Sequence, residues 1–194
     1  AGVSLDKAKY GSQIKVDIEL DWRIPINIYK GLFIEELEEI DLEIKHLNLQ
    51  KLYFANDNAL SNNYGLLDTE ASSYVPLTIN YNDNEYKAKT RVKGNWKDSR
   101  SNDKLSLRIK LPNDNTIMGM KRFSIHDPKV KSYLHEWLFH ELLKHEDLIA
   151  ARYDFIKVSI NGDKRGIFAI EEHFDKRLIE NNKRREGLIL KIKL

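Results

Sequence analysis

The sequence lacks cysteine altogether, and this absence excludes disulfide bonds and thiolate metal sites. It has no apolar run of about 18 residues, the length that a membrane-spanning helix requires, so no such helix is predicted. It also lacks a large excess of charge, because 32 basic residues stand against 30 acidic ones. A net charge of +2 gives little bulk attraction to nucleic acid or to a membrane surface. Any electrostatic function must therefore come from a local cluster of charge.

Several motifs of well-known enzyme classes are missing as well. No G-x-x-x-x-G-K-[ST] or G-x-G-x-x-G segment occurs, so neither a P-loop nor a Rossmann site is supported, and no G-x-S-x-G elbow is present. Two stretches resemble the zinc-protease motif H-E-x-x-H, but His135, His140 and His145 are spaced five apart instead of four. Successive members of this series lie about 140° apart around a helix. They are therefore not expected to share a metal ion.

The pattern of apolar residues predicts a mixed, strand-rich fold. Strands are predicted near residues 14–20, 24–28, 40–44, 76–81, 86–93, 104–111, 120–125, 153–160 and 166–170, with helices at 48–60, 131–146 and 174–185 and a final strand in GLILKIKL. Turn signals such as Asn161-Gly162 join neighbouring strands. The fold class expected from this order is α+β, a largely antiparallel sheet with packed helices.

Positive charge gathers in the segment from Arg91 to Leu111. Alternation along two predicted strands puts Lys87, Lys89, Arg91 and Lys93 on one face of the first, and Lys104, Ser106, Arg108 and Lys110 on one face of the second. If the strands are neighbours, these faces coincide, because the apolar faces must share one core. Like charges facing each other across strands are destabilising, so such a face favours a counter-anion.

Two interpretations of this basic face remain open from the residues alone. It is either a solvated lysine-rich surface, which also protects a sheet from aggregation, or the binding site of an anion such as phosphate. Glu171 and Glu172, at the end of a predicted strand, either pair with the basic face or bind a ligand. A nucleic-acid-binding sheet is disfavoured, because Trp96 and Phe123 are too few aromatics beside these strands.

Five separate segments together resemble the CotH kinase family, named for spore coat protein H. They are RVKGNW (91–96), DKLSLRIKL (103–111), GMKRFSI (119–125), YLHEWLFHELL (133–143) and VSINGDKRGIFAIEEHFDKRLIE (158–180), and the closing GLILKI (187–192) also fits. The resemblance implies an atypical protein-kinase-like lobe that uses ATP with Mg²⁺ or Mn²⁺ to phosphorylate protein serine. The residues that it implies at the nucleotide are Arg91, Lys93, Lys104, Arg108, Glu171, Glu172 and Lys191.

The sequence departs from the family in one respect. Members carry a later D-x-D-type motif for metal and chemistry, and this sequence reaches Leu194 without it. We therefore expect an N-terminal extension at 1–70 and a CotH-like core at 71–194 that binds nucleotide but does not transfer phosphate by itself. The alternative is an inactive surface or coat-assembly binding module. The resemblance also implies a location at the cell surface and a serine-rich protein as partner.

Overall fold

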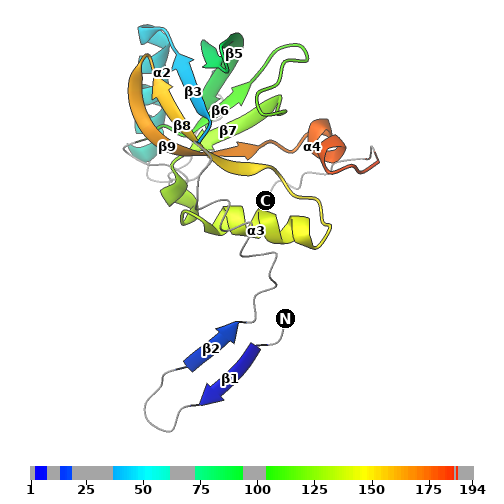
Figure 1. Cartoon of the computed structure of the whole chain (residues 1–194). Coiled ribbons are helices and arrows are strands. Elements are labelled where there is room, and N and C mark those ends of the chain that lie inside the picture. Colours follow the sequence, from blue (N-terminus) through cyan, green and yellow to red (C-terminus); the bar gives the residue numbers. More distant parts are fainter. Residues whose placement is uncertain are drawn as a thin grey trace. The chain divides into compact units, whose positions relative to one another are not determined.

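The computed structural model describes residues 3–7, 14–18, 37–61, 73–93, 104–185 and 187 (Figure 1). The chain divides into two compact units, residues 1–37 and 38–194. In the first unit, β1 (Val3–Lys7) and β2 (Ile14–Ile18) form an antiparallel pair in which Leu5 lies opposite Val16. The predicted strand at 24–28 lies outside the described residues. No helix in the described ranges is long and apolar enough to cross a membrane.

The second unit is built around a closed barrel of seven strands. These are β3 (Glu39–Glu43), β4 (Val75–Tyr81), β5 (Asn84–Val92), β6 (Leu107–Lys110), β7 (Arg122–His126), β8 (Tyr153–Ile160) and β9 (Asp163–Glu172). Their order around the barrel is β3-β4-β5-β6-β7-β9-β8. The parallel pairing of β3 with β8 closes the sheet, and all the other neighbouring strands are antiparallel.

Strict alternation along the strands produces the core of the barrel. Ala88 and Val92 on β5, Ile109 on β6 and Phe123 and Ile125 on β7 are all buried and belong to one apolar cluster that receives side chains from every strand. Each fully buried aliphatic or aromatic side chain of this kind stabilises the fold by roughly 2 kcal/mol relative to its exposure. The residues between them point away from this core, so the polar face of each strand lies on the outside of the barrel.

In the described ranges, four helical segments accompany the barrel: α2 (His46–Ser61), the 3₁₀ turn η2 (Pro128–Lys131), α3 (His135–His145) and α4 (Lys176–Asn181). Asp127 and Asp175 begin η2 and α4, and each side chain accepts a hydrogen bond from the backbone N–H two residues later. This is the usual way for aspartate to satisfy an unpaired donor at a helix start. α3 contacts β8 and lies beside the barrel in Figure 1, and η2 contacts β9.

The predicted fold class, an α+β kinase-like lobe in which helices pack on a largely antiparallel sheet, is wrong. The molecule is mostly a closed barrel with few short helices. The physical reason lies partly in α3, one of the helices that were expected to pack on the sheet. Leu134, Leu138 and Leu142 are each about half exposed, and the one buried residue of this helix is His140. α4 is also only six residues long, much shorter than the helix predicted at 174–185.

The local elements were predicted better than their assembly. β3, α2, the meander of β4, β5 and β6, and the hairpin of β8 and β9 all lie where the sequence pattern placed them. The predicted division of the chain at residue 70 stays a prediction. In the structure, β3 and β4, which flank that position, are neighbouring strands of the same barrel.

Candidate functional site

A row of polar residues crosses five strands on the outer face of the barrel. Arg91 on β5 lies opposite Arg108 on β6, Arg108 lies opposite Ser124 on β7, and Ser124 lies opposite Glu171 on β9. Tyr153 on β8 completes the row opposite Glu171. Residues directly opposite each other share one face of a sheet. The prediction that the cationic faces of the two basic strands coincide is therefore confirmed.

The basic face is not uniform along the strands. Lys87, Lys89 and Lys110, at one end, are exposed to solvent. Arg91, Lys93 and Arg108, at the other end, are only partly exposed, and the side chain of Lys93 is 17% exposed. The two interpretations of the basic face thus apply to different parts of it. The exposed lysines form a solvated surface, whereas the second group has the reduced solvation that strengthens electrostatic binding. We call Arg91, Lys93, Arg108 and Glu171 the cationic cluster.

Lys93 and Glu171 form an ion pair within the cationic cluster, in which the Lys93 ammonium donates a hydrogen bond to Glu171 Oε2. Burial lowers the pKa of Lys93, against the opposing effect of Glu171, and the charges of Arg108 and Lys131 lower it further. Burial alone would raise the pKa of Glu171, but the charge and hydrogen bond of Lys93 outweigh it and hold that pKa below its usual value. The ion pair therefore stays charged in a partly buried setting, with the charges of Arg108 and Lys131 nearby.

Arg91 and Arg108 place two guanidinium groups side by side. Burial lowers the pKa of Arg108, and the neighbouring charge of Arg91 adds to the effect. An arginine stays protonated in proteins, so this environment costs stability instead of removing the charge. Arg108 Nε is buried and has no hydrogen-bond partner among the described residues, while the Arg91 guanidinium lies 5.4 Å from the centre of the Tyr74 ring. Among the described residues, Glu171 supplies a carboxylate beside these cations.

A wall of buried aromatic and imidazole groups lies beside the cationic cluster. His126 Nε2 is 3.3 Å from the Tyr153 hydroxyl, and the His140 ring of α3 stacks on the Tyr153 ring with centroids 5.9 Å apart. Burial, followed by the charge of Lys93, lowers the pKa of His126 to about 4. Burial also lowers the pKa of His140 and raises that of Tyr153. These three groups are therefore uncharged at neutral pH.

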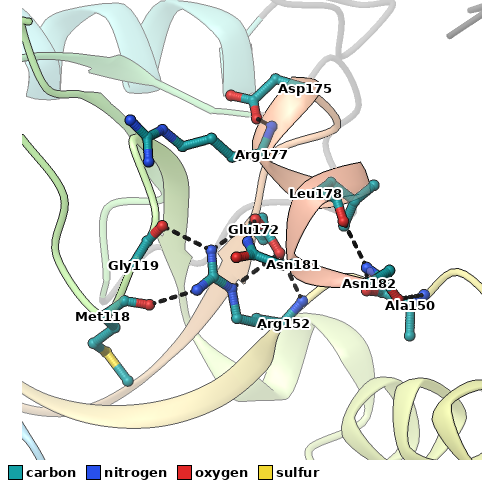
Figure 2. A network of polar contacts seen from close by, with 10 residues as sticks. All are labelled: Met118, Gly119, Ala150, Arg152, Glu172, Asp175, Arg177, Leu178, Asn181 and Asn182. Carbon is teal, nitrogen blue, oxygen red and sulfur yellow. Dashed lines mark hydrogen bonds and ion pairs between the residues drawn. The ribbon is translucent and has the colours of Figure 1, made fainter. Parts of the chain in front are cut away.

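Glu172 points to the opposite side of β9 and belongs to a different network (Figure 2). The Arg152 guanidinium donates from Nε and Nη2 to its two carboxylate oxygens, at 3.1 and 2.8 Å, and Asn181 Nδ2 donates at 2.9 Å. Arg152 also donates to the carbonyl oxygens of Met118 and Gly119. Glu172 is 2% exposed, so its charge is satisfied by neighbours within the fold.

The remaining predicted site residues are not brought to the cationic cluster by any described contact. The Lys104 ammonium donates to the carbonyl oxygen of Ile167 at 2.7 Å and lies 5.0 Å from the centre of the Phe168 ring. Lys191 lies outside the described residues. Within the described ranges, no group of three or more histidine or acidic side chains is arranged to hold a metal ion.

Residues 90–193, just over half of the chain, match the family model described as CotH kinase protein. The chain belongs to the CotH kinase family. The matched span contains every residue of the cationic cluster, so the cluster is a feature of the CotH domain and not of the segment before it. A search of curated proteins found no match to the chain.

Sequence reasoning missed two residues that the CotH domain places at the cluster, His126 and Tyr153. The predicted strand ended at Ile125, one residue too early, because Pro128 follows closely. The alternation of Arg122, Ser124 and His126 with buried residues was the available signal for His126. Tyr153 was expected in a strand, but the register that puts it opposite Glu171 was not predictable from the pattern.

Proposed function

We propose that this CotH domain binds ATP through its phosphates at Arg91, Lys93 and Arg108, as the nucleotide-binding part of a protein kinase that phosphorylates serine. The observation that carries the proposal is the cationic cluster itself, in which Arg91, Lys93 and Arg108 lie together on one partly buried face of the barrel. Membership of the CotH kinase family supports a kinase-related role. The cell surface as its location and a serine-rich protein as its substrate rest on family resemblance.

The chemistry of the cluster suits a polyphosphate. Like charges held together in a poorly solvated setting repel one another, and an anion with several oxygens relieves that repulsion. Guanidinium groups bind phosphate oxygens in pairs, and the unpartnered Arg108 Nε is one such donor. Phosphoryl transfer depends mostly on positioning and charge stabilisation, which fixed cations supply. The charges of the cluster would attract the phosphates, and its guanidinium donors would orient them.

The divalent metal that kinases of this family are expected to use is a separate requirement. Mg²⁺ and Mn²⁺ prefer carboxylate oxygens, and the described residues contain no suitable group of acids. Glu171 is held by Lys93 and Glu172 by Arg152. The described residues therefore fit the phosphates but not the metal.

Isothermal titration calorimetry with ATP tests the proposal. We expect Arg108→Ala to weaken ATP binding by about tenfold or more, since a hydrogen bond to a charged group contributes about 1.5–3 kcal/mol. Lys110→Ala is the matched control, because Lys110 lies on the same strand and face but at the exposed end. That variant should bind ATP nearly as well as the wild type.

Equal losses of ATP affinity in the two variants would show that ATP responds only to the overall positive charge of the surface. If the wild type shows no measurable ATP binding, the proposal is overturned. In the second case the alternative, an inactive surface or coat-assembly binding module, becomes the better account of the chain. Thermal unfolding of each variant, followed by circular dichroism, separates lost binding from lost structure.

A further inference from the structure

His126 presents an unused donor position to the cationic cluster. Its ring is 2% exposed, and its Nδ1 atom has no hydrogen-bond partner among the described residues. This atom lies 3.9 Å from Glu171 Oε2, the same oxygen that accepts the hydrogen bond of Lys93. A buried polar atom without a hydrogen-bond partner destabilises the fold, so its place beside the Lys93–Glu171 pair needs an explanation.

The surroundings decide which ring nitrogen carries the proton. The imidazole is neutral, so one nitrogen donates and the other accepts. The Tyr153 hydroxyl keeps its proton, because burial raises its pKa, and it can donate to Nε2 at 3.3 Å. The negative Glu171 oxygen facing Nδ1 favours an N–H there over a lone pair. Nδ1–H therefore points at Glu171 from just beyond hydrogen-bonding distance.

The ammonium group of Lys93, which a phosphate would contact, is already paired with Glu171. A phosphate oxygen and the Glu171 carboxylate are both negative, so they repel each other when both contact Lys93. Glu171 is only 25% exposed, and a carboxylate displaced in this setting needs another hydrogen-bond donor. Nδ1 of His126, 3.9 Å from Glu171 Oε2, is a described donor that is not already engaged.

We propose that His126 is a positioning residue of the phosphate site: an entering phosphate takes Lys93 from Glu171, and the displaced carboxylate accepts a hydrogen bond from His126 Nδ1. This inference rests on the proposed function, because it describes how the same cluster admits its ligand. The site then has two states. Without ligand, Glu171 pairs with Lys93. With ligand, the phosphate contacts Lys93 and Glu171 contacts His126.

The first test is the effect of Glu171→Gln on ATP affinity, measured by calorimetry. Removing the competing charge should tighten ATP binding about fivefold or more, because the phosphate no longer displaces an ionised partner from Lys93. If Glu171 instead merely holds Lys93 in place for ATP, the same substitution weakens binding. An unchanged or weaker affinity in Glu171→Gln, with wild-type binding intact, overturns the exchange and leaves the proposed function standing.

The second test is a double-mutant cycle with His126. His126→Leu should weaken ATP binding about fivefold in the wild-type background and have little effect in the Glu171→Gln background, because no charged carboxylate then needs the donor. His126→Gln, which keeps an N–H donor, should restore most of the affinity. Equal losses from His126→Leu in both backgrounds would indicate a merely structural role and overturn the inference.

Nuclear magnetic resonance of ¹⁵N-labelled histidine provides a readout that does not depend on a variant. Without ligand, His126 should be neutral with its proton on Nδ1, and addition of ATP should shift the Nδ1 resonance as the new hydrogen bond forms. A proton on Nε2, or no response of Nδ1 to bound ATP, contradicts the exchange. Inorganic tripolyphosphate separates the two proposals. If it gives the whole pattern while ATP does not bind, the nucleotide function fails and the exchange stands.

Discussion

At the scale of single residues, His126 shows how burial changes the response of the molecule to pH. Its pKa of about 4 in the fold lies below the unfolded value of 6.5, mainly because of burial and then because of the charge of Lys93. The unfolded chain therefore binds this proton at a higher pH than the folded chain does. The stability that neutral His126 contributes is fully present above pH 6.5 and is lost progressively as the pH falls toward 4.

We predict that the free energy of unfolding falls by about 2 kcal/mol more in the wild type than in His126→Gln between pH 7 and pH 5. Urea denaturation at each pH measures this difference. The contribution of His140, whose pKa is also lowered by burial, is common to both proteins and cancels. His135→Gln, at an exposed histidine, should follow the wild-type curve. Parallel curves for the wild type and His126→Gln would contradict the buried, neutral state of this residue.

At the scale of elements, the turn between Ile117 and Met120 depends on the Arg152–Glu172 network. Met118 and Gly119 have φ values of 50° and 73°, the two positive angles of a type I′ turn, and their carbonyl oxygens accept hydrogen bonds from Arg152. A Cβ atom added at Gly119 would lie 2.4 Å from Arg152 Nη1. The network thus ties this turn to β8, β9 and α4 (Figure 2).

We predict that Gly119→Ala destabilises the fold by about 1–2 kcal/mol more than Gly162→Ala, measured by urea denaturation. Both glycines have positive φ, so both substitutions introduce backbone strain of about 1–2 kcal/mol. At Gly162 nothing lies within 4 Å of the added atom, and that variant reports the strain alone. The excess at Gly119 should vanish in an Arg152→Ala background. Equal losses of unfolding free energy in the two variants would show that the Arg152 side chain moves aside without cost.

At the scale of the whole molecule, Asn161 helps to close the barrel. Its side-chain oxygen accepts a hydrogen bond from Ile44 N at 2.7 Å, and its Nδ2 donates to Ile44 O at 2.9 Å. Its own backbone N–H donates to Leu42 O. The side chain therefore continues the parallel pairing of β3 with β8 beyond the end of β8, joining parts of the chain 117 residues apart.

We predict that Asn161→Ala lowers the free energy of unfolding by about 2–3 kcal/mol, from two hydrogen bonds of about 1 kcal/mol each and some strain at its φ of 53°. Asn113→Ala is the control, because Asn113 has a similar φ of 52° on an exposed turn and should lose only about 1 kcal/mol. Hydrogen exchange at the Ile44 amide should accelerate in Asn161→Ala. An effect no larger than that of Asn113→Ala would contradict a role in closure.

The same whole-molecule scale marks the limit of sequence reasoning. The shared face of the basic residues on β5 and β6 was predictable, because alternation and a common core allow only one arrangement of the two faces. The closure of the sheet into a barrel was not predictable, because strands alternate in the same way in open sheets and in barrels. The pairing of β3 with β8 also joins distant segments of the chain. Glu171 and Glu172 were treated together, although neighbours in a strand point to opposite faces, and the structure gives them different partners.

The most direct test of the account is a crystal structure of the protein with a non-hydrolysable ATP analogue. We predict phosphate oxygens within hydrogen-bonding distance, about 2.7–3.2 Å, of Arg108 Nε and Lys93 Nζ, and Glu171 turned from Lys93 to His126. Phosphates bound away from Arg91, Lys93 and Arg108 would contradict the central claim. Phosphates at these cations with the Lys93–Glu171 pair intact would support the site and contradict the exchange.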